Sequence, residues 1–319
     1  MSDQHERFVD IIRHAYDNDQ CLNISGCNSK SFLRATTSGE RLDTLVHEGI
    51  ITYEPSELVV TARSGTSITD LQEVLAQEHQ TLAFDPPCFD SSGTIGGAVA
   101  TGLSGPSRPW NGAARDHVLG VHIINGKGEA LEFGGQVIKN VAGYDVSRLM
   151  TGAYGTLGLL LDISIKVLPL PEVTLTIVQE SSAEHAIEYI NKLAGSSLPL
   201  TGACWMDNQL YIRIAGTDAG AKAAYSKIGG DKLEHNQLWQ LLRDHELDFF
   251  QSDFWRISLP PATAMLPLSG QWLIDWGGAQ RWLRTDADAE SIITAATAAG
   301  GHAEQWQAPD RTFLRPKLD

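Results

Sequence analysis

The sequence predicts an α+β protein of two domains, and three observations indicate this fold class. A chain of 319 residues usually forms two domains. Its first part alternates helical and strand-like hydrophobic patterns, whereas its second part is rich in hairpin-like strand pairs, which is typical of helices packed on an antiparallel sheet. The proline-rich stretch 169–171 separates these parts, so we expect domains at residues 1–170 and 171–319.

The elements of the first domain follow from hydrophobic periodicity and turn residues. Apolar positions at helical spacing predict a helix over 5–17. Ser67 and Asp70 have the spacing of an N-terminal capping box and precede the apolar face of a second helix. The turn sequence Asn-Gly-Lys-Gly at 125–128 lies between two strand-like stretches and predicts a hairpin. Further strands are expected at 21–24, 50–53, 58–62 and 157–169, and a short helix at 145–150.

The second domain is predicted to be built on an antiparallel sheet. A strand at 173–180 is followed by a helix at 183–194, and residues 201–216 read as a hairpin that turns at Asp207 and Asn208. An alanine-rich helix and a helix near 234–247 follow. The remaining predicted elements are strands at 254–260, 271–278 and 281–285 and a helix at 287–299.

Composition excludes several classes of function. The net charge of −15 argues against non-specific nucleic-acid binding, which depends on basic side chains. The polar N-terminus is not a secretory signal, and no apolar run approaches the roughly 20 residues that a membrane span needs. Four scattered cysteines lack the spacing of a zinc site or an iron–sulfur cluster and fit a reducing cytosol, so we expect no metal site.

Three glycine-rich or small-residue segments are the main candidates for ligand binding. Consecutive small residues in 24–30 present backbone N–H groups that can form an anion nest. The stretch 93–105 has five glycines and no charge, and the third segment is 149–158. Each segment taken singly is more typical of a structural turn than of a ligand site, but together they indicate a ligand long enough to touch several loops. The sequence contains neither a P-loop nor a Rossmann fingerprint.

The ordered set of these segments resembles a known flavoprotein superfamily. SGCNSK, YEPSELVVTARSGTSITDLQEVL, FDPP, GTIGGAVATG, ARDHVLG, FGGQVIKNVAGYD and YGTLGLLLDISIKVLP occur in the order found in the p-cresol methylhydroxylase/vanillyl-alcohol oxidase (PCMH/VAO) flavoproteins. Within that superfamily, KNVAGYDVSRLMTGAYGTLG is similar to the family of smaller flavin-domain subunits of glycolate oxidase complexes. The match is dense over residues 20–170. Beyond them it is thinner and includes FWRISLP.

The resemblance implies an FAD-binding domain of two α/β subdomains and a short α+β cap domain with an antiparallel sheet. The first loop would hold the pyrophosphate through backbone amides, with Ser25, Gly26, Asn28 and Ser29 as its residues. A second group would line the flavin and the pyrophosphate: Pro87, Gly93, Thr94, Gly96 and Gly97. A third would contact the flavin or order the adjoining loops: Arg115, Asp116, Tyr144, Asp145, Gly155 and Thr156. The backbone amide of Ile163 would meet the adenine, and a local ion pair is the alternative for Arg115 and Asp116.

The chain departs from these flavoproteins at two points. Many relatives attach FAD through a histidine of the first loop, where this chain has Asn28, so we expect non-covalent FAD; a thioether to the nearby Cys27 or Cys88 is not expected.

The histidine-rich catalytic motif of related 2-hydroxy-acid dehydrogenases is also missing, which leaves the catalytic residues unidentified. His235, His245 and His302 are isolated and read as surface or capping residues. Arg256, and after it Arg281, are candidates for binding a substrate carboxylate; the alternative for each is a strand arginine packed over an aromatic ring or ion-paired.

The resemblance therefore implies an FAD-binding subunit of a multi-subunit glycolate (2-hydroxy-acid) oxidase or dehydrogenase. Such a subunit oxidises glycolate to glyoxylate, and electrons pass through flavin and partner iron–sulfur clusters to quinone. Its expected partners are a larger flavin subunit, an iron–sulfur subunit and a small 2-hydroxy acid. Its expected location is the cytoplasm, or the inner face of the membrane through those partners. Two alternatives stay open: a non-catalytic flavin-binding or scaffolding subunit, and a free-standing FAD-dependent 2-hydroxy-acid oxidase.

Overall fold

The structure is a computed structural model that describes residues 4–33, 39–89, 92–135, 144–234, 237–306 and 313–314. The chain divides into two compact units. The first unit comprises Met1–Gly105 and Gly112–Leu170, and the second comprises Pro106–Asn111 and Pro171–Asp319. The short segment Pro106–Asn111 thus belongs to the second unit, although the chain on both sides of it belongs to the first.

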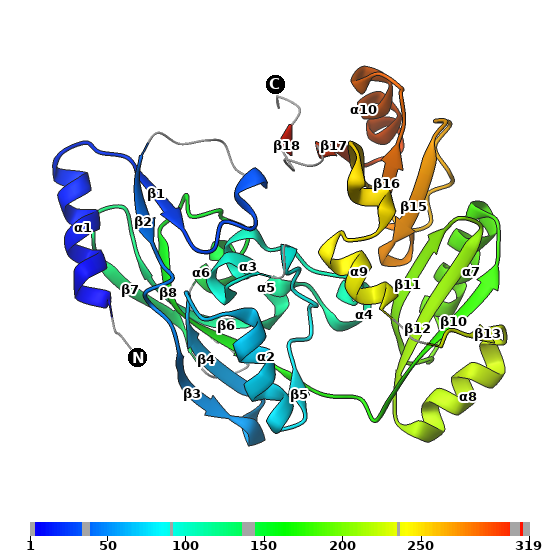
Figure 1. The fold of residues 1–319 in the computed structure, drawn as a ribbon, viewed down its shortest axis with the longest axis horizontal. Coiled ribbons are helices and arrows are strands. Elements are labelled where there is room, and N and C mark those ends of the chain that lie inside the picture. Colours follow the sequence, from blue (N-terminus) through cyan, green and yellow to red (C-terminus); the bar gives the residue numbers. More distant parts are fainter. Residues whose placement is uncertain are drawn as a thin grey trace. The chain divides into compact units, whose positions relative to one another are not determined.

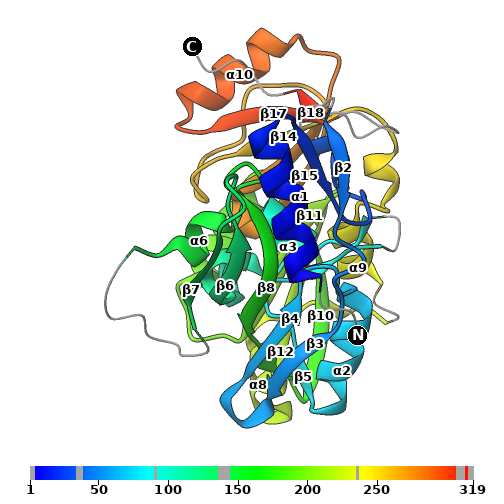
Figure 2. The same ribbon diagram turned by 90° about the vertical axis from the view of Figure 1, so that its left-hand side faces the viewer.

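The first unit contains a five-stranded antiparallel sheet in the order β3-β4-β8-β6-β7. Its strands are β3 (Ile50–Glu54), β4 (Val59–Arg63), β8 (Leu159–Lys166), β6 (Val118–Ile124) and β7 (Ala130–Gly134). Helices α2 (Ile68–Gln77) and α3 (Ile95–Thr101) cover one face, because their apolar side chains share a buried core with this sheet. Figure 2 shows β6, β7 and β8 side by side, with the short helix α6 (Val146–Met150) near them.

A second layer of the same unit lies on the other face of the sheet. Helix α1 (His5–Asp17) lies beside the parallel pair β1 (Leu22–Ser25) and β2 (Glu40–Asp43), as Figure 1 shows. Phe8 and Ile12 of α1 pack against Leu161 of β8, whereas the next apolar residue of that strand, Ile163, belongs to the opposite core. Two α/β layers therefore share β8. The small elements of this unit are η1 (Ser31–Leu33), η2 (Pro55–Glu57), α5 (Ala114–His117) and the pair β5 (Gln80–Thr81) and β9 (Leu168–Pro169).

The described part of the second unit forms a nine-stranded antiparallel sheet in the order β13-β10-β12-β11-β15-β16-β14-β17-β18. The strands are β10 (Val173–Glu180), β11 (Leu200–Met206), β12 (Gln209–Gly216), β13 (Asp231–Lys232), β14 (Phe254–Ser258), β15 (Gln271–Asp275), β16 (Gln280–Arg284), β17 (His302–Trp306) and β18 (Phe313–Leu314). Helices α7 (Ala183–Ala194), α8 (Asp218–Ile228) and α10 (Ala289–Ala298) pack on one face through a common apolar core. The other elements are α4 (Arg108–Asn111), α9 (Leu238–Asp244), η4 (Asp248–Gln251) and η5 (Trp276–Gly278).

Most of the predicted helices and strands are confirmed. The helix at 5–17 and the helix at 183–194 have the predicted bounds. Asp207 and Asn208 both adopt positive φ, at 50° and 59°, as the predicted tight turn of that hairpin requires. The side chain of Ser67 caps α2 by accepting the amide N–H groups of Thr69 and Asp70. None of the helices in the described ranges is both long and apolar enough to cross a bilayer.

Candidate functional site

A cavity of about 110 Å³ lies in the first unit, where the three predicted ligand-binding segments meet. It is lined mainly by small side chains and backbone from separate stretches of the chain. These lining residues are Ile24–Ser31, Thr44, Ser64, Thr94, Gly96, Gly97, Ala100, Thr101, Met150, Tyr154, Gly155 and Gly158–Leu160. A volume of this size accommodates one portion of a dinucleotide.

The first loop, which follows β1, presents backbone N–H groups to this cavity. Asn28 adopts a left-handed conformation with φ of 62°, and its side-chain oxygen accepts the hydroxyl of Ser25 at 2.7 Å. Among the backbone hydrogen bonds of the described residues, the amides of Gly26, Cys27 and Asn28 are not donors. Left-handed residues in a loop make neighbouring N–H groups converge on one point, which creates a site for an anion.

The glycines of the second segment allow two chain segments to approach each other closely. A Cβ atom on Gly96 would lie 2.6 Å from the Cβ of Ser64, and one on Gly26 would lie 3.1 Å from Oγ1 of Thr94. Thr94 in turn accepts the amide N–H of Gly97 at 3.1 Å and caps α3. Ser64 is buried, and its hydroxyl has no hydrogen-bond partner among the described residues. Buried hydroxyls are normally hydrogen-bonded, so this atom indicates a polar ligand.

The third segment is docked on α3 through its backbone. The amide of Tyr154 donates to the carbonyl of Ala100 at 2.8 Å, and the amide of Gly152 donates to that of Val99 at 3.0 Å. Gly155 has a φ of 75°, a conformation that glycine adopts without strain. These two hydrogen bonds to α3 hold the segment in place as part of the cavity lining.

Lys30 is a cavity residue that was not among the predicted site residues. It ends the first loop, is 8% exposed, and its Nζ lies 5.4 Å from the ring centroid of Phe89. Cys27 also lines the cavity: burial by itself would raise the pKa of its thiol, but hydrogen bonds from Ser29 and the charge of Lys30 hold it below the ordinary value. The sequence alone shows this lysine directly after a loop of small residues, so it could have been predicted as a site residue.

The structure brings half of the predicted cofactor residues together at the cavity. Those in its lining are Ser25, Gly26, Asn28, Ser29, Thr94, Gly96, Gly97 and Gly155. Those outside it are Pro87, Gly93, Arg115, Asp116, Tyr144, Asp145, Thr156 and Ile163. The cofactor role of every one of these residues stays a prediction.

Several residues outside the lining have structural contacts. Asp116 accepts the amide of Ala113 at 2.9 Å, and Asp145 caps α6 by accepting the amide of Arg148 at 3.1 Å. Ile163 is fully buried in β8, between β4 and β6. Residues 139–143, which begin the motif KNVAGYD quoted for the resemblance, lie outside the described residues, and Tyr144, which follows them, is 94% exposed.

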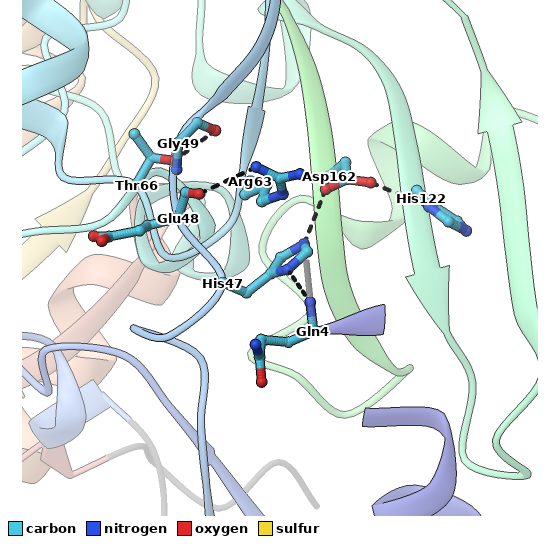
Figure 3. A network of polar contacts seen from close by, with 8 residues as sticks. All are labelled: Gln4, His47, Glu48, Gly49, Arg63, Thr66, His122 and Asp162. Atoms are coloured by element: carbon cyan, nitrogen blue, oxygen red, sulfur yellow. Dashed lines mark hydrogen bonds and ion pairs between the residues drawn. The ribbon is translucent and has the colours of Figure 1, made fainter. Parts of the chain in front are cut away.

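A polar network joins Gln4, His47, His122 and Asp162 of the first unit, as Figure 3 shows. Asp162 of β8 lies 3.0 Å from Nε2 of His47 and 3.2 Å from Nδ1 of His122, and Nδ1 of His47 accepts the amide of Gln4. Burial by itself would raise the pKa of the Asp162 carboxyl, but these two histidine hydrogen bonds hold it below the ordinary value. The amide of His47 donates to the carbonyl of Thr44, a residue of the cavity lining, so the network fixes the loop beneath the cavity.

The two arginines predicted as substrate candidates lie on strands of the second unit. Arg281 is fully buried and donates to the main-chain carbonyls of Gly278, Ala264 and Thr263, and burial lowers the pKa of its guanidinium to about 10. This geometry favours the structural alternative for Arg281, since its donors join strand β16 to the turn at Gly278 and to the loop between β14 and β15.

Arg256 has a mixed environment in the same sheet. Its Nε donates to Gln280 at 2.9 Å, its Nη1 lies 3.7 Å from Glu304, and its guanidinium lies 5.4 Å from the ring centroid of Trp276. Its side chain is 18% exposed. These contacts also favour a structural role, and binding of a substrate carboxylate by Arg256 stays a prediction.

The histidines of the second unit differ from one another. His245 is at the C-terminal end of α9 with a φ of 57° and stacks on Phe250, with ring centroids 4.2 Å apart. His302 is exposed on β17, and His235 lies outside the described residues. No cluster of three or more histidine, cysteine or acidic side chains able to hold a metal ion is found within the described ranges.

Comparisons with known proteins agree on one family. The family model of an FAD binding domain matches residues 2–134. Glycolate oxidase subunit GlcE of Escherichia coli is 45% identical over 98% of this chain and 89% of that protein. Glycolate oxidase subunit GlcD of Bacillus subtilis is 32% identical over 48% of this chain and 33% of its own length.

A D-lactate dehydrogenase of Anaerostipes hadrus is 32% identical over 40% of this chain and 27% of its own length. The solved structure of an alkyldihydroxyacetonephosphate synthase superposes with a TM-score of 0.68 and 15% identity, covering 93% of this chain and 70% of that one. This likeness and the match to the FAD binding domain together confirm the predicted fold of the PCMH/VAO type. The chain belongs to the family of glycolate oxidase subunit GlcE, within the FAD-binding flavoproteins of the PCMH/VAO type.

Proposed function

We propose that this chain is the FAD-binding subunit of a multi-subunit glycolate (2-hydroxy-acid) oxidase or dehydrogenase. The observation that carries the proposal is the similarity to glycolate oxidase subunit GlcE along nearly the whole chain. The cavity supports it, because its small residues, its loop amides and the buried hydroxyl of Ser64 fit the polar middle portion of FAD. When bound, FAD accepts two electrons and releases them singly.

The residues of the first unit would bind and orient this cofactor. The amides of the first loop would hold the diphosphate, and Gly96 and Gly97 would let it lie against α3. Asn28 occupies the position at which many relatives attach FAD covalently, and its amide side chain is no nucleophile, so the proposed binding is non-covalent. The second unit would act as the substrate-side cap, with Arg256 as the first candidate for contact with a substrate carboxylate.

That this chain works in a complex is inferred from the names of the similar proteins, two of which are subunits of glycolate oxidase. We infer a complex in which a larger flavin subunit and an iron–sulfur subunit accept the electrons and pass them to quinone. Association with such partners would place the chain in the cytoplasm or at the inner face of the membrane.

A second candidate is a flavin-binding subunit that does no chemistry itself. The contacts of Arg281 and Arg256 favour it, because both predicted substrate cations are engaged by groups of the second unit. In that case the larger flavin subunit would oxidise glycolate. A free-standing oxidase is the remaining alternative and predicts hydrogen peroxide formation from glycolate without partners.

Anaerobic reduction of the purified chain separates these functions. We expect the isolated chain to be yellow and its oxidised-flavin absorbance to bleach on addition of glycolate or D-lactate. A Gly96→Val variant, whose side chain would overlap Ser64, should lose both FAD and bleaching, whereas Gly126→Val in the open hairpin turn should retain both. A protein that stays yellow would support the non-catalytic candidate, and a colourless wild-type chain would contradict both.

A further inference from the structure

His47 connects the N-terminal helix α1 to the sheet of the first unit, as Figure 3 shows. The residue is 2% exposed, and the ring of Phe8 on α1 packs edge-on against it with centroids 5.9 Å apart. Its Nδ1 accepts the backbone N–H of Gln4, the N-cap residue of α1, at 3.3 Å. Its Nε2 lies 3.0 Å from Oδ1 of Asp162 on β8. Both nitrogens of this buried imidazole are therefore hydrogen-bonded.

These two hydrogen bonds define where the hydrogen of the His47 ring lies. A backbone N–H can only donate, so Nδ1, which accepts the amide of Gln4, carries no hydrogen. The ring hydrogen is then on Nε2 and is donated to the carboxylate of Asp162. A second proton has to be added at Nδ1, where it would face the N–H of Gln4, so that two donors meet. The charged form of His47 is therefore incompatible with the contact that holds the start of α1.

The backbone of His47 is bonded to the lining of the cavity. Its amide donates to the carbonyl of Thr44 at 3.1 Å, and its carbonyl accepts the amide of Gly65 at 2.8 Å. Thr44 donates twice to the carbonyl of Ser25, through its amide at 2.9 Å and through its hydroxyl at 3.2 Å. Thr44 and Ser25 both line the cavity, and Ser25 begins its first loop. A displacement of His47 is therefore transmitted to the loop that would hold the diphosphate.

The charged groups around this network increase its response to acid. Hydrogen bonds from the two histidines hold the pKa of Asp162 below its ordinary value, so the carboxylate stays charged while histidines gain protons. Nδ1 of His122 lies 3.2 Å from Oδ2 of Asp162, and the ring of His5 lies 4.9 Å from that of His122. Acid thus gathers positive charge at the N-terminal end of α1, where the helix dipole disfavours it. The other charged residues on the surrounding segments are Glu6 of α1, Asp43 and Glu48 on either side of His47, Arg63 opposite Asp162 and Glu132 opposite His122.

We propose that His47 is a positioning residue that makes retention of FAD sensitive to acid. The neutral side chain joins the start of α1 to the side of the cavity formed by Thr44 and Ser25. When Nδ1 takes a proton from solvent, the hydrogen bond to Gln4 is lost and this side of the cavity is released from α1. The coupling is reciprocal, so bound FAD also stabilises α1. The inference rests on FAD occupying the cavity, as the proposed function requires.

The test is the FAD affinity of the apoprotein at several pH values, measured by quenching of flavin fluorescence. Wild-type affinity should fall by about threefold to tenfold between about pH 8 and about pH 5.5, the range in which a histidine gains its proton. His47→Gln keeps a donor and an acceptor but does not titrate, so its affinity should stay constant over this range. The matched controls are His14→Gln, exposed on α1, and His122→Gln, on the other side of Asp162; both should keep the wild-type pH dependence.

The pH profile separates a positioning role from a merely structural one. A structural loss in His47→Gln would weaken FAD binding equally at every pH and leave the wild-type slope, which would overturn the proposal. A wild-type affinity that does not change with pH, or a slope that disappears in His122→Gln and persists in His47→Gln, would also overturn it.

Hydrogen exchange of the wild-type chain gives the same test if His47→Gln does not fold. At about pH 6, FAD should slow amide exchange in α1 more than in α8 of the second unit, because only α1 is joined to the cavity through His47 among these two helices. Equal slowing in both helices, or none, would overturn the coupling. A folded wild-type chain that binds no FAD at any pH would overturn the proposed function as well.

Discussion

The cavity of the first unit and the arginine-bearing strands of the second unit differ in how far their polar groups are hydrogen-bonded. In the cavity lining, the amides of Gly26, Cys27 and Asn28 donate no backbone hydrogen bond, and the hydroxyl of Ser64 has no hydrogen-bond partner among the described residues. On β14 and β16, Arg281 and Arg256 are both engaged by neighbouring groups of their own unit. A ligand site must leave hydrogen-bonding capacity unused in the ligand-free chain, whereas a structural site uses it up. By this criterion the first unit is prepared for a ligand and the two arginines are not.

The same contrast holds for backbone packing. Gly96 allows α3 to approach Ser64 so closely that a methyl group would not fit, which creates the thin wall of the cavity. In the second unit, a comparable approach is used for stability: Gly202 contacts the ring of Trp239, whose indole N–H donates to Thr176. A glycine therefore allows close packing at the cavity wall in the first unit and against an aromatic side chain in the second.

Replacing Arg281 by methionine should give the largest loss of stability. The change leaves the main-chain carbonyls of Gly278, Ala264 and Thr263 without their donor at a fully buried position, so we expect the free energy of unfolding to fall by about 3 kcal/mol. Urea unfolding of the apoprotein measures it. Arg284→Met is the matched control, because the guanidinium of Arg284 makes only weak contacts, a hydrogen bond of 3.4 Å with Gln271 and a cation–π contact at 6.0 Å from the ring centroid of Phe249, among those of the described residues, and its loss should cost less than about 0.5 kcal/mol. An unchanged stability together with a raised KM for glycolate would contradict the structural assignment of Arg281.

Replacing Gly96 by alanine should act on the cavity instead. The new methyl group would lie 2.6 Å from the Cβ of Ser64, and displacing that segment should cost about 2 kcal/mol of stability. The same displacement should weaken FAD binding by at least about tenfold. Fluorescence titration of the apoprotein with FAD checks this, with Gly126→Ala as the control, since nothing lies within 4 Å of a Cβ there. Equal FAD affinity of the two variants would show that the close approach at Gly96 does not shape the cavity.

Replacing Asp162 by asparagine tests the network that supports the cavity. The folded-state pKa of Asp162 lies below its ordinary value, so the carboxylate contributes stability that is fully present above about pH 4 and is lost as the pH falls through the folded pKa. We expect Asp162→Asn to cost about 1–2 kcal/mol at pH 7 and to approach the wild type below pH 4. Urea unfolding at several pH values measures the difference. A pH-independent difference would mean that the charge of Asp162 has no part in it.

The sequence was a good guide to the fold and a partial guide to the site. Periodicity and caps predicted α1, α7 and the hairpin at Asp207 because these elements are determined by local residues. Strands β2 and β17 were not predicted, since their short polar sequences form strands only by pairing with distant segments.

The site showed the same division between local and distant information. The three small-residue segments were found by composition. The contribution of Ser64 and Thr44 depends on contacts across the sheet that no local pattern contains. The structural contacts of Arg281 likewise become visible only when strand β16 and the loop between β14 and β15 are placed together.

Replacing Arg256 by lysine should change stability least, and it tests whether Arg256 binds a substrate carboxylate. Its ion pair with Glu304 is 3.7 Å long, and both side chains are nearly a fifth exposed, so the pair should contribute less than about 1 kcal/mol. Lysine keeps the charge but loses the planar guanidinium, and with it the contact to Gln280 and the stacking on Trp276. We therefore expect Arg256→Lys to lower the free energy of unfolding by about 1 kcal/mol and to leave FAD affinity unchanged.

Glycolate-dependent bleaching of the flavin is the measurement that separates the two roles of Arg256. If this arginine is structural, Arg256→Lys should bleach at the wild-type rate and glycolate concentration. If it binds the substrate carboxylate, the glycolate concentration for half-maximal bleaching should rise by about tenfold or more, because a point charge replaces a two-pronged donor. The second result would remove the contrast between the units, since a strand arginine engaged within its own unit would then also serve a ligand.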